Sequence, residues 1–336
     1  MTHSQNTNPP KKKTKGFLVV YAYVILILLI LATGSAYAWM LLTQTPRVSN
    51  LSVYINSFSG MEIAASPEKE DAWSQQLTYE QLFPESYELR PATWSAQDKM
   101  LYGAVYSITG KIQEDKWKPL SDSENANSTS EENYYCVASF YARTDTAVQV
   151  SLAPAVTLQE NTAIAGTYLM GRPEWNADDV CHDNGGRGAE YAIRIAIGVT
   201  RLDGALSPLG EEEMYIYEPN ATYHADGTYG YVPTPSIDGT PSLVPEDKII
   251  AQNTSRWGEK TPHEHNALLY HAGSFTGDAK LFTMQEGETV KLRLIIWLEG
   301  RDVDCTNKIE DASIFANLQF DAQTIGGGGL VPIPKK

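Results

Sequence analysis

A short acidic turn carries the side chains best suited to binding a metal ion. Glu299, Asp302 and Asp304 lie within six residues of one another, and Arg301 stands among them. Calcium takes about six to eight oxygen ligands, many of them carboxylates, so these three acids are candidate calcium ligands. Their spacing differs from that of an EF-hand loop, and aspartates in turns often cap backbone amides. We favour capping, and we expect neither a bound metal nor a cofactor.

The chain has three cysteines, too few for a disulfide framework. Cys136 lies in the apolar run YYCVASFYA, which predicts a buried thiol without a disulfide partner. Cys181 and Cys305 fall in polar segments beside expected strands, and they are the predicted disulfide pair. A bridge between them requires Cα atoms no more than about 7 Å apart.

Tyrosines are concentrated in one part of the sequence. Tyr217, Tyr223 and Tyr229 belong to a group between residues 215 and 231. A tyrosine ring combines apolar contact with a polar tip, which suits the face of a sugar or a protein partner. Aromatic residues are also frequent in strands, where they pack a sheet. The three tyrosines are therefore candidate ligand contacts, with core packing as the other interpretation.

Residues used in hydrolysis are present but form no recognised motif. The sequence contains no Gly-x-Ser-x-Gly elbow. The glycine-rich segment 184–188 is not followed by the Lys-Ser or Lys-Thr pair of a phosphate-binding loop. We therefore expect no catalytic residues, although active sites on β-sandwiches can be assembled from distant loops.

Strands must position all of these side chains, because alternating apolar residues recur between clusters of Gly, Pro, Asn and Asp. The pattern predicts an all-β fold, a β-sandwich of jelly-roll type. In strand 289–298, Val290, Leu292 and Leu294 fall on one face, and strand 314–320 alternates in the same way. We expect these two strands to lie in one sheet. The expected strands are 48–58, 100–112, 134–142, 147–158, 191–200, 214–218, 267–271, 289–298 and 314–320.

Other segments interrupt or flank the sandwich, which is expected to span residues 47–325. Segment 68–82 is the best helix candidate. Segments 121–133 and 222–262 are rich in small and polar residues and are expected to be long loops. Residues 326–336 begin with four glycines and are expected to form a flexible tail.

The N-terminal region predicts export. A basic tail, residues 1–16, precedes the apolar segment 17–42, and basic flanks stay cytoplasmic. The segment is long enough to cross about 30 Å of hydrocarbon as a helix. It would leave the later residues extracytoplasmic in a single-pass protein of the cell membrane. Ala36-Tyr37-Ala38 also resembles a signal-peptidase site, so cleavage after Ala38 and secretion is the alternative.

The charge excludes some partners. All 26 basic residues and 41 acidic residues give a net charge of −15, and four lysines precede the apolar segment with no acid among them. The remainder carries 22 basic and 41 acidic residues, or −19. Such a surface repels nucleic acid and anionic headgroups, so we expect no nucleic-acid partner.

Several segments resemble known exported proteins. The stretch KKKTKGFLVVYAYVILILLILATGSAYAWM resembles the SipW-like signal region of TasA- and camelysin-like surface proteins of Firmicutes. RLIIWLEGRDVDC and SIFANLQFDA resemble uncharacterised clostridial exported proteins with a WLEG-x-D-x-D-C segment. The resemblance implies an extracellular jelly roll of the biofilm-matrix type, in which strand 48–58 could complement a neighbouring subunit. It brings no catalytic residues.

Three functions are consistent with these features. The leading hypothesis is a non-enzymatic structural or adhesive protein of the cell surface, such as a matrix or fibre subunit. It would be attached to the membrane by its N-terminal helix and would bind copies of itself or glycans of the cell envelope. The alternative is an extracellular carbohydrate- or ligand-binding module, and the second alternative is an envelope hydrolase.

Overall fold

The computed structural model describes residues 20–33, 48–57, 60–83, 88–96, 98–107, 112–120, 133–154, 156–159, 163–171, 189, 192–219, 248–252, 275–276, 279–302, 305, 309 and 312–325. The chain divides into two compact units. One comprises Met1–Gln44 with Ser107–Lys111, and the other comprises Thr45–Tyr106 with Ile112–Lys336.

The first unit contains a helix over residues 20–33, whose last turn is closed by a hydrogen bond from Thr33 Oγ1 to the Leu29 carbonyl oxygen. Its apolar side chains, from Val20 to Leu31, are exposed. The rest of the predicted apolar helix, residues 17–19 and 34–42, lies outside the described residues. Within the described parts of the chain, none of the helices has the length and apolar character needed to cross a membrane.

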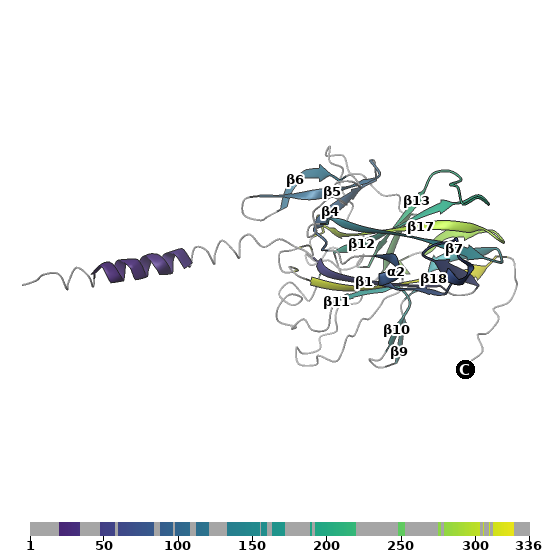
Figure 1. The fold of residues 1–336 in the computed structure, drawn as a ribbon, viewed down its shortest axis with the longest axis horizontal. Helices are drawn as coiled ribbons and strands as arrows, with labels where there is room; N and C mark the ends of the chain where they lie inside the picture. Colours follow the sequence, from purple (N-terminus) through teal and green to yellow (C-terminus); the bar gives the residue numbers. More distant parts are fainter. Residues whose placement is uncertain are drawn as a thin grey trace, which may run out of the picture. The chain divides into compact units, whose positions relative to one another are not determined.

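The second unit is built from two main β-sheets, which confirms the predicted all-β sandwich (Figure 1). In the described residues the smaller sheet has six strands, in the order β16-β8-β18-β1-β3, with β11 also paired to β18. Its centre is β18, which runs parallel to β1 from the pair Val48/Ala312 to the pair Ser57/Phe320. The strands are β1 (Val48–Ser57), β3 (Gln76–Leu77), β8 (Val148–Leu152), β11 (Tyr168–Gly171), β16 (Lys280–Met284) and β18 (Ala312–Thr324).

The larger sheet has ten strands in the described residues and is centred on β17. β17 pairs antiparallel with β12 on one side and with β7 on the other, and its last residues pair in parallel with β4. The strands are β2 (Met61–Ala64), β4 (Pro91–Ser95), β5 (Met100–Tyr106), β6 (Ile112–Pro119), β7 (Tyr135–Thr144), β12 (Ile193–Arg201), β13 (Glu213–Glu218), β14 (Ile249–Gln252), β15 (Phe275–Thr276) and β17 (Thr289–Glu299). A separate hairpin joins β9 (Val156–Gln159) to β10 (Ala163–Ala165).

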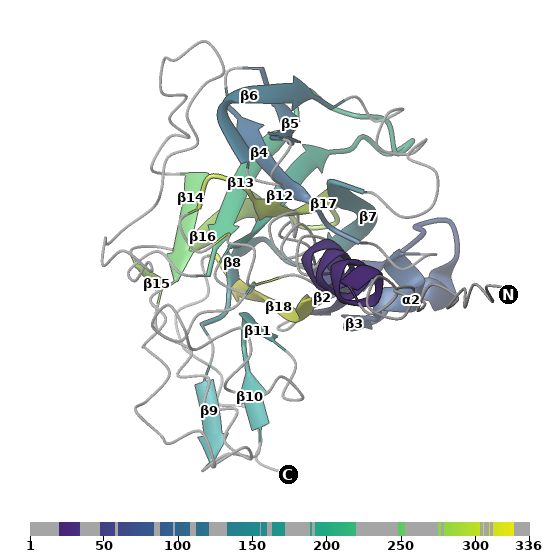
Figure 2. The ribbon, with the colours of Figure 1, turned by 90° about the vertical axis from the view of Figure 1, so that its left-hand side faces the viewer.

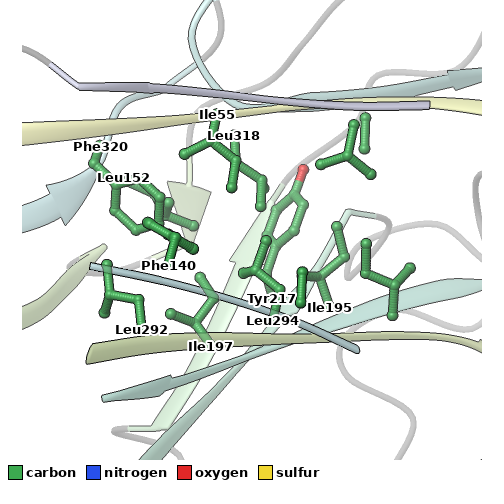
Figure 3. Close-up of a cluster of buried hydrophobic side chains, with 14 of the residues drawn as sticks. Ile55, Phe140, Leu152, Ile195, Ile197, Tyr217, Leu292, Leu294, Leu318 and Phe320 are labelled. Carbon is green, nitrogen blue, oxygen red and sulfur yellow. The ribbon is translucent and has the colours of Figure 1, made fainter. Parts of the chain in front are cut away.

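The main core lies between the two sheets (Figure 3). Leu292 and Leu294 on β17 face Leu318 and Phe320 on β18, and all four are fully buried. The alternation predicted for β17 and β18 is correct, but their placement in one sheet is wrong. The alternation of apolar residues shows which face of a strand is buried, but it does not show which strand lies beside it. Two strands in opposite sheets that share one core therefore have the same pattern as two strands of one sheet.

The end of the larger sheet that contains β4, β5 and β6 forms a third layer over the outer face of the sheet's other strands. β4, β5 and β6 lie on the side of β12, β13 and β17 that faces away from β18 (Figures 1 and 2). Trp94 and Leu101 from this layer are buried in a second cluster with Ala196, Ile216 and Trp297 of the larger sheet. The middle of β17 is therefore buried on both faces.

The predicted helix 68–82 is wrong for most of its length. The segment forms a 3-10 turn, η1 (Glu70–Ala72), then β3, and only then the single-turn helix α2 (Tyr79–Leu82). Ser74 exchanges two backbone hydrogen bonds with Ile63 of β2, so sheet pairing interrupts the helical pattern. Helix α2 starts afresh where the Gln81 side chain accepts a hydrogen bond from the Thr78 backbone amide.

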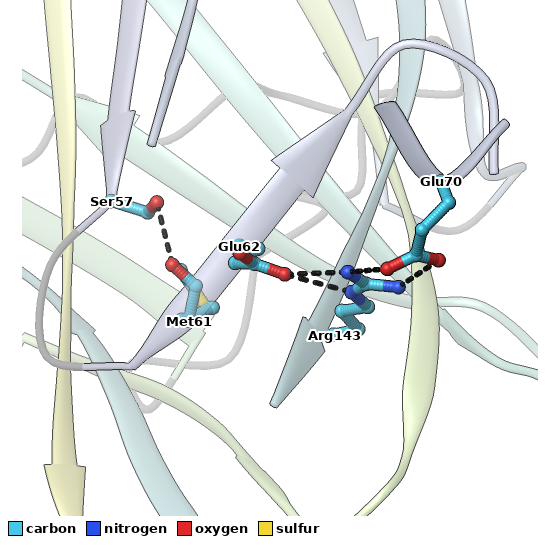
Figure 4. Close-up of polar contacts among 5 residues, drawn as sticks. All are labelled: Ser57, Met61, Glu62, Glu70 and Arg143. Atoms are coloured by element: carbon cyan, nitrogen blue, oxygen red, sulfur yellow. Dashed lines mark hydrogen bonds and ion pairs between the residues drawn. The ribbon is translucent and has the colours of Figure 1, made fainter. Parts of the chain in front are cut away.

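An arginine fixes η1 to the larger sheet. Arg143 on β7 contacts Glu62 on β2 and Glu70 on η1 (Figure 4). Its guanidinium also lies 4.4 Å from the centre of the Trp73 ring. The hydrogen bonds from Arg143 lower the pKa of the Glu70 carboxyl. This arrangement connects β2, η1 and β7 at the corner where the chain passes from the smaller sheet to the larger one.

The predicted loops are described only in part. Residues 121–132 and 326–336 lie outside the described residues, and Asn133 forms a bridge with Leu89. In segment 222–262, the described residues include β14, which pairs in parallel with β13, so this segment is not loop throughout.

Candidate functional site

The outer face of the larger sheet has a hollow at one end, beside small residues of β12. On β12, Gly198 stands between Met214 of β13 and Arg293 of β17. In the next row Ala196 stands between Ile216 and Ile295. A Cβ atom at Gly198 would collide with the Glu212 carboxylate, so the side chain of Glu212 occupies the space that glycine leaves.

This hollow is a pocket of about 570 Å³, a volume typical of small-ligand sites. Its apolar part comes from Trp94 and Ala96 of the covering layer and from Met214 and Ile216 of β13. Charged side chains complete the lining: Lys99, Glu211, Glu212, Glu213, Lys248 and Arg293. We call this site the sheet pocket.

Each of the three consecutive glutamates in the sheet pocket has a cationic partner. Lys99 lies 3.0 Å from Glu211, and both side chains are largely exposed, at 70% and 89%. Arg293 binds Glu212 through two nitrogens, and this pair is less exposed, at 32% and 24%. The pocket is therefore lined by alternating charges of both signs above an apolar floor.

The third pair is held by an aromatic ring. Lys248 Nζ lies 3.0 Å from Glu213 Oε2, and it lies 4.3 Å from the centre of the Tyr215 ring. The Tyr215 hydroxyl is also within hydrogen-bond distance of both groups. The hydrogen bond from Lys248 is the main cause that lowers the pKa of Glu213. Glu213 is thus held in its ionised form, in which it only accepts hydrogen bonds.

Lys99 occupies its position in the pocket with a left-handed backbone, at φ 53°. This conformation costs roughly 1–2 kcal/mol for a residue other than glycine. Replacing Lys99 with glycine removes that cost. It also destabilises the folded state by about 0.5–1 kcal/mol, because glycine gives the unfolded chain more conformational freedom. Because the exposed Lys99/Glu211 pair contributes little, we expect Lys99→Gly to raise the free energy of unfolding by about 0.5–1 kcal/mol. Urea denaturation measures this, and Lys116→Gly, on exposed strand β6, is a control expected to destabilise.

The other end of the same sheet face contains a buried cluster of charges. Arg194 on β12 lies 2.6 Å from Asp302 and 2.7 Å from Glu218 of β13, and all three are almost completely buried. Glu299, also buried, accepts hydrogen bonds from the Trp297 indole and the Arg301 amide. We call Arg194, Glu218, Glu299 and Asp302 the buried charge cluster.

The cluster changes the interpretation of the predicted calcium ligands. Asp302 is paired with Arg194, and Glu299 binds an indole and a backbone amide, so neither carboxylate is directed at a metal. Asp304 lies outside the described residues. Within the described parts of the chain, no group of three or more metal-binding side chains is placed to hold an ion. Capping was predicted for the aspartates of this turn, but it is Glu299 that accepts a hydrogen bond from the amide of Arg301, and Asp302 pairs with Arg194.

Burial raises the pKa of Glu299, and the charge of Arg194 opposes this only in part. A carboxyl whose pKa is raised by folding binds a proton more readily in the native state than in the unfolded state. Its contribution to stability is therefore fully present below its ordinary pKa. That contribution is lost as the pH rises through the higher pKa of the native state. Glutamine cannot titrate, so the Glu299→Gln variant does not lose this contribution. As the pH rises from about 5 to about 8, we expect its free energy of unfolding to increase relative to that of wild type. Urea denaturation at both pH values measures this, and a constant difference would contradict it.

The structure describes one of the three candidate ligand contacts, Tyr217. Tyr217 is fully buried in the main core, so the prediction that its ring contacts a ligand is wrong and core packing is correct (Figure 3). The reason is register: Tyr215 and Tyr217 point inward on β13, while Met214 and Ile216 point outward. Tyr223 and Tyr229 lie outside the described residues.

The cysteines are described in part. Cys136 is fully buried and has no disulfide partner, as predicted, and burial raises the pKa of its thiol. Cys305 is partly exposed and packs against the main core. Cys181 lies outside the described residues, so its pairing with Cys305 stays a prediction.

The sequence contained signals of the sheet pocket that were not used. Glu212, just before β13, alternates with Met214 and Ile216 on that strand, and this change from polar to apolar residues marks a strand face that becomes buried along its length. Gly198 and Ala196 alternate on β12 and lack bulky side chains. Only the register of β12 between β13 and β17 places these residues side by side.

Comparison with known proteins adds no family to these observations. Among protein-family models, curated proteins and solved structures, nothing matches this chain. The function is therefore argued from the geometry of the chain itself.

Proposed function

We propose that this chain is a non-enzymatic binding protein of adhesive type, displayed outside the cell, which binds a small ligand or an exposed group of a partner in the sheet pocket. The single observation that carries the proposal is the pocket itself, which apolar side chains such as Met214 and Ala96 line together with charged ones. Ligand sites of this kind are mostly apolar with a few fixed polar groups. The display outside the cell rests on the apolar N-terminal segment as a membrane anchor.

The state of the acids favours binding over catalysis. A general acid or base works best when its pKa lies near the operating pH. The pKa of Glu213 is lowered instead, and Glu211 and Glu212 are each paired with a cation. The Glu213 carboxylate can hold a ligand by charge and hydrogen bonds, and it is poorly suited to donating a proton.

A pocket-filling variant tests this proposal. Ala96 lines the pocket from the turn after β4, so Ala96→Trp is expected to fill the mouth. Purified wild-type chain is applied to immobilised cell-wall polysaccharide, N-acetylglucosamine oligomers and mixed short peptides. We expect wild type to retain at least one of these and Ala96→Trp to retain less of it, with the ligand recovered unchanged. Equal retention by the two chains, or conversion of the ligand into a product, would overturn the proposal.

Self-assembly is a second candidate function, and the pairing of β1 favours it. β1 is held along its length by β18, as a parallel strand from a distant part of the chain. Within the described residues, its other edge pairs only near the ends, at Val48 with Leu89 and at Ile55 and Asn56 with β3. A strand held mainly on one side can be exchanged for the same strand of a neighbouring copy.

A peptide that copies β1 tests this second function. A synthetic peptide of residues 48–57, added in excess to the full chain, is expected to compete with β1 for its place on β18 and to shorten any polymers seen by light scattering. A scrambled peptide of the same composition is the control. Polymers of unchanged length, or a chain that remains monomeric at high concentration, would argue against strand exchange.

A further inference from the structure

The sheet pocket is balanced in charge, although the chain is strongly acidic. Its lining contains three glutamates and three cations, Lys99, Lys248 and Arg293, so the formal charges cancel. A site for a simple anion or cation would carry an excess of the opposite sign. This pocket instead has equal numbers of positive and negative side chains beside its apolar lining. Such a pocket matches a ligand that carries one charge of each sign.

The floor favours an aliphatic or aromatic side chain over a sugar ring. Trp94 lines the pocket, but only 5% of its surface is exposed, which leaves too little for a sugar ring to stack on. The neighbouring Ile216 is fully buried, so the apolar contact comes from Met214, which is partly exposed. Methionine is flexible and adapts to side chains of different shape.

The three ion pairs differ in how easily a ligand can replace them. Arg293 holds Glu212 with two nitrogens at a partly buried position above Gly198. Lys248 is held by Glu213 and by the Tyr215 ring. The Lys99/Glu211 pair has the most exposed side chains of the three, and exposed pairs contribute little to stability. A charged ligand can therefore separate Lys99 from Glu211 at little cost, while the other two pairs stay in place.

We propose that the sheet pocket binds short hydrophobic peptides with free termini. The ammonium group pairs with Glu211, the terminal carboxylate pairs with Lys99, and an apolar side chain lies on Met214 beside Ala96. This inference rests on the proposed binding function and names the ligand class for the same pocket. The left-handed backbone of Lys99, which costs stability, is consistent with a role for this lysine in binding.

Calorimetry on the full-length chain tests the ligand class. The probe is trileucine with free termini, compared with trileucine acetylated at its N-terminus and amidated at its C-terminus, and with tri-N-acetylglucosamine. We expect trileucine to bind, its blocked form to bind at least tenfold more weakly, and added salt to weaken trileucine, because exposed charges are screened. Equal binding of the free and blocked peptides would overturn the role of the termini and would point to an internal peptide segment as the ligand.

Surface variants assign the two contacts. Lys99→Gln and Glu211→Gln are each expected to weaken trileucine about fivefold, the effect of one exposed charge contact. Lys116→Gln, an exposed lysine on β6, is the matched control and should leave binding unchanged. If trileucine binds equally to all four chains, the peptide proposal is wrong. If the N-acetylglucosamine trimer binds wild type but not Ala96→Trp, the binding function stands and only the peptide class fails. If no probe binds, both fail.

Discussion

Replacing Arg194 with methionine is expected to lower the free energy of unfolding by about 3–5 kcal/mol. The guanidinium of Arg194 lies within 2.7 Å of both Glu218 and Asp302, and all three side chains are almost fully buried. Methionine has a similar length but no charge, so the variant leaves two carboxylates in the interior without their cation. Removing one member of a buried ion pair is costly for this reason, while exposed pairs contribute little.

Urea denaturation of wild type and Arg194→Met measures the effect. Arg201→Met is the matched control, because Arg201 lies on the same strand and pairs with Glu288 at a partly exposed position. We expect the control to lose about 1 kcal/mol or less. The triple variant Arg194→Met, Glu218→Gln and Asp302→Asn should recover part of the loss, because it removes the unpaired charges. If Arg194→Met is no worse than Arg201→Met, the cluster does not depend on its arginine.

The second large effect is expected at the contact between the two sheets. Phe320 on β18 and Phe140 on β7 are fully buried, and their ring centres lie 6.1 Å apart across the core (Figure 3). Truncating a buried phenylalanine costs about 3–5 kcal/mol, through lost apolar contact and the cavity that remains. We expect Phe320→Ala to fall in this range, as measured by chemical denaturation.

The same strand provides a control for this prediction. Phe315 points to the other face of β18, where it is partly exposed and contacts the rings of Tyr54 and Tyr168. Phe315→Ala should therefore cost clearly less than Phe320→Ala. A double-mutant cycle with Phe140→Ala should give a coupling of about 0.5–1.5 kcal/mol, as for other aromatic pairs. Equal effects at Phe315 and Phe320 would mean that β18 does not bury the face assigned to it.

The sequence predicted the faces of strands well and their partners poorly. The alternation in β17 identified Val290, Leu292, Leu294 and Ile296 as core residues, and all are buried. It also suggested that Ile295 lies on the outer face, which is correct, but that face is covered by β4, β5 and β6. The covering strand β4, PATWS, has no alternating pattern and was not predicted. Covering of a face by strands from a distant part of the chain leaves no local signal.

The candidate site was missed for a related reason. Charged residues such as Glu212 and Arg293 look like a solvated face when each strand is considered alone. Only the register brings Arg293 of β17 and Met214 of β13 to either side of Gly198, over which the Glu212 side chain lies. Tyr217 shows the opposite error: a tyrosine-rich segment suggested ligand contact, although the alternation on β13 directs this ring into the core. Register across three strands is a non-local property, so neither result could be read from one segment.

The parallel pairing of β1 with β18 has a consequence for how the chain folds. Asn56 and Asn317 are joined by a hydrogen bond although 261 positions separate them in sequence. On the ribosome, β1 therefore emerges long before its main partner exists, and the smaller sheet cannot close until β18 has been synthesised. Pairings between distant segments are slow to form and leave sheet edges exposed in the meantime. Folding should thus be late and slow, with β1 as the segment most exposed to aggregation until β18 arrives.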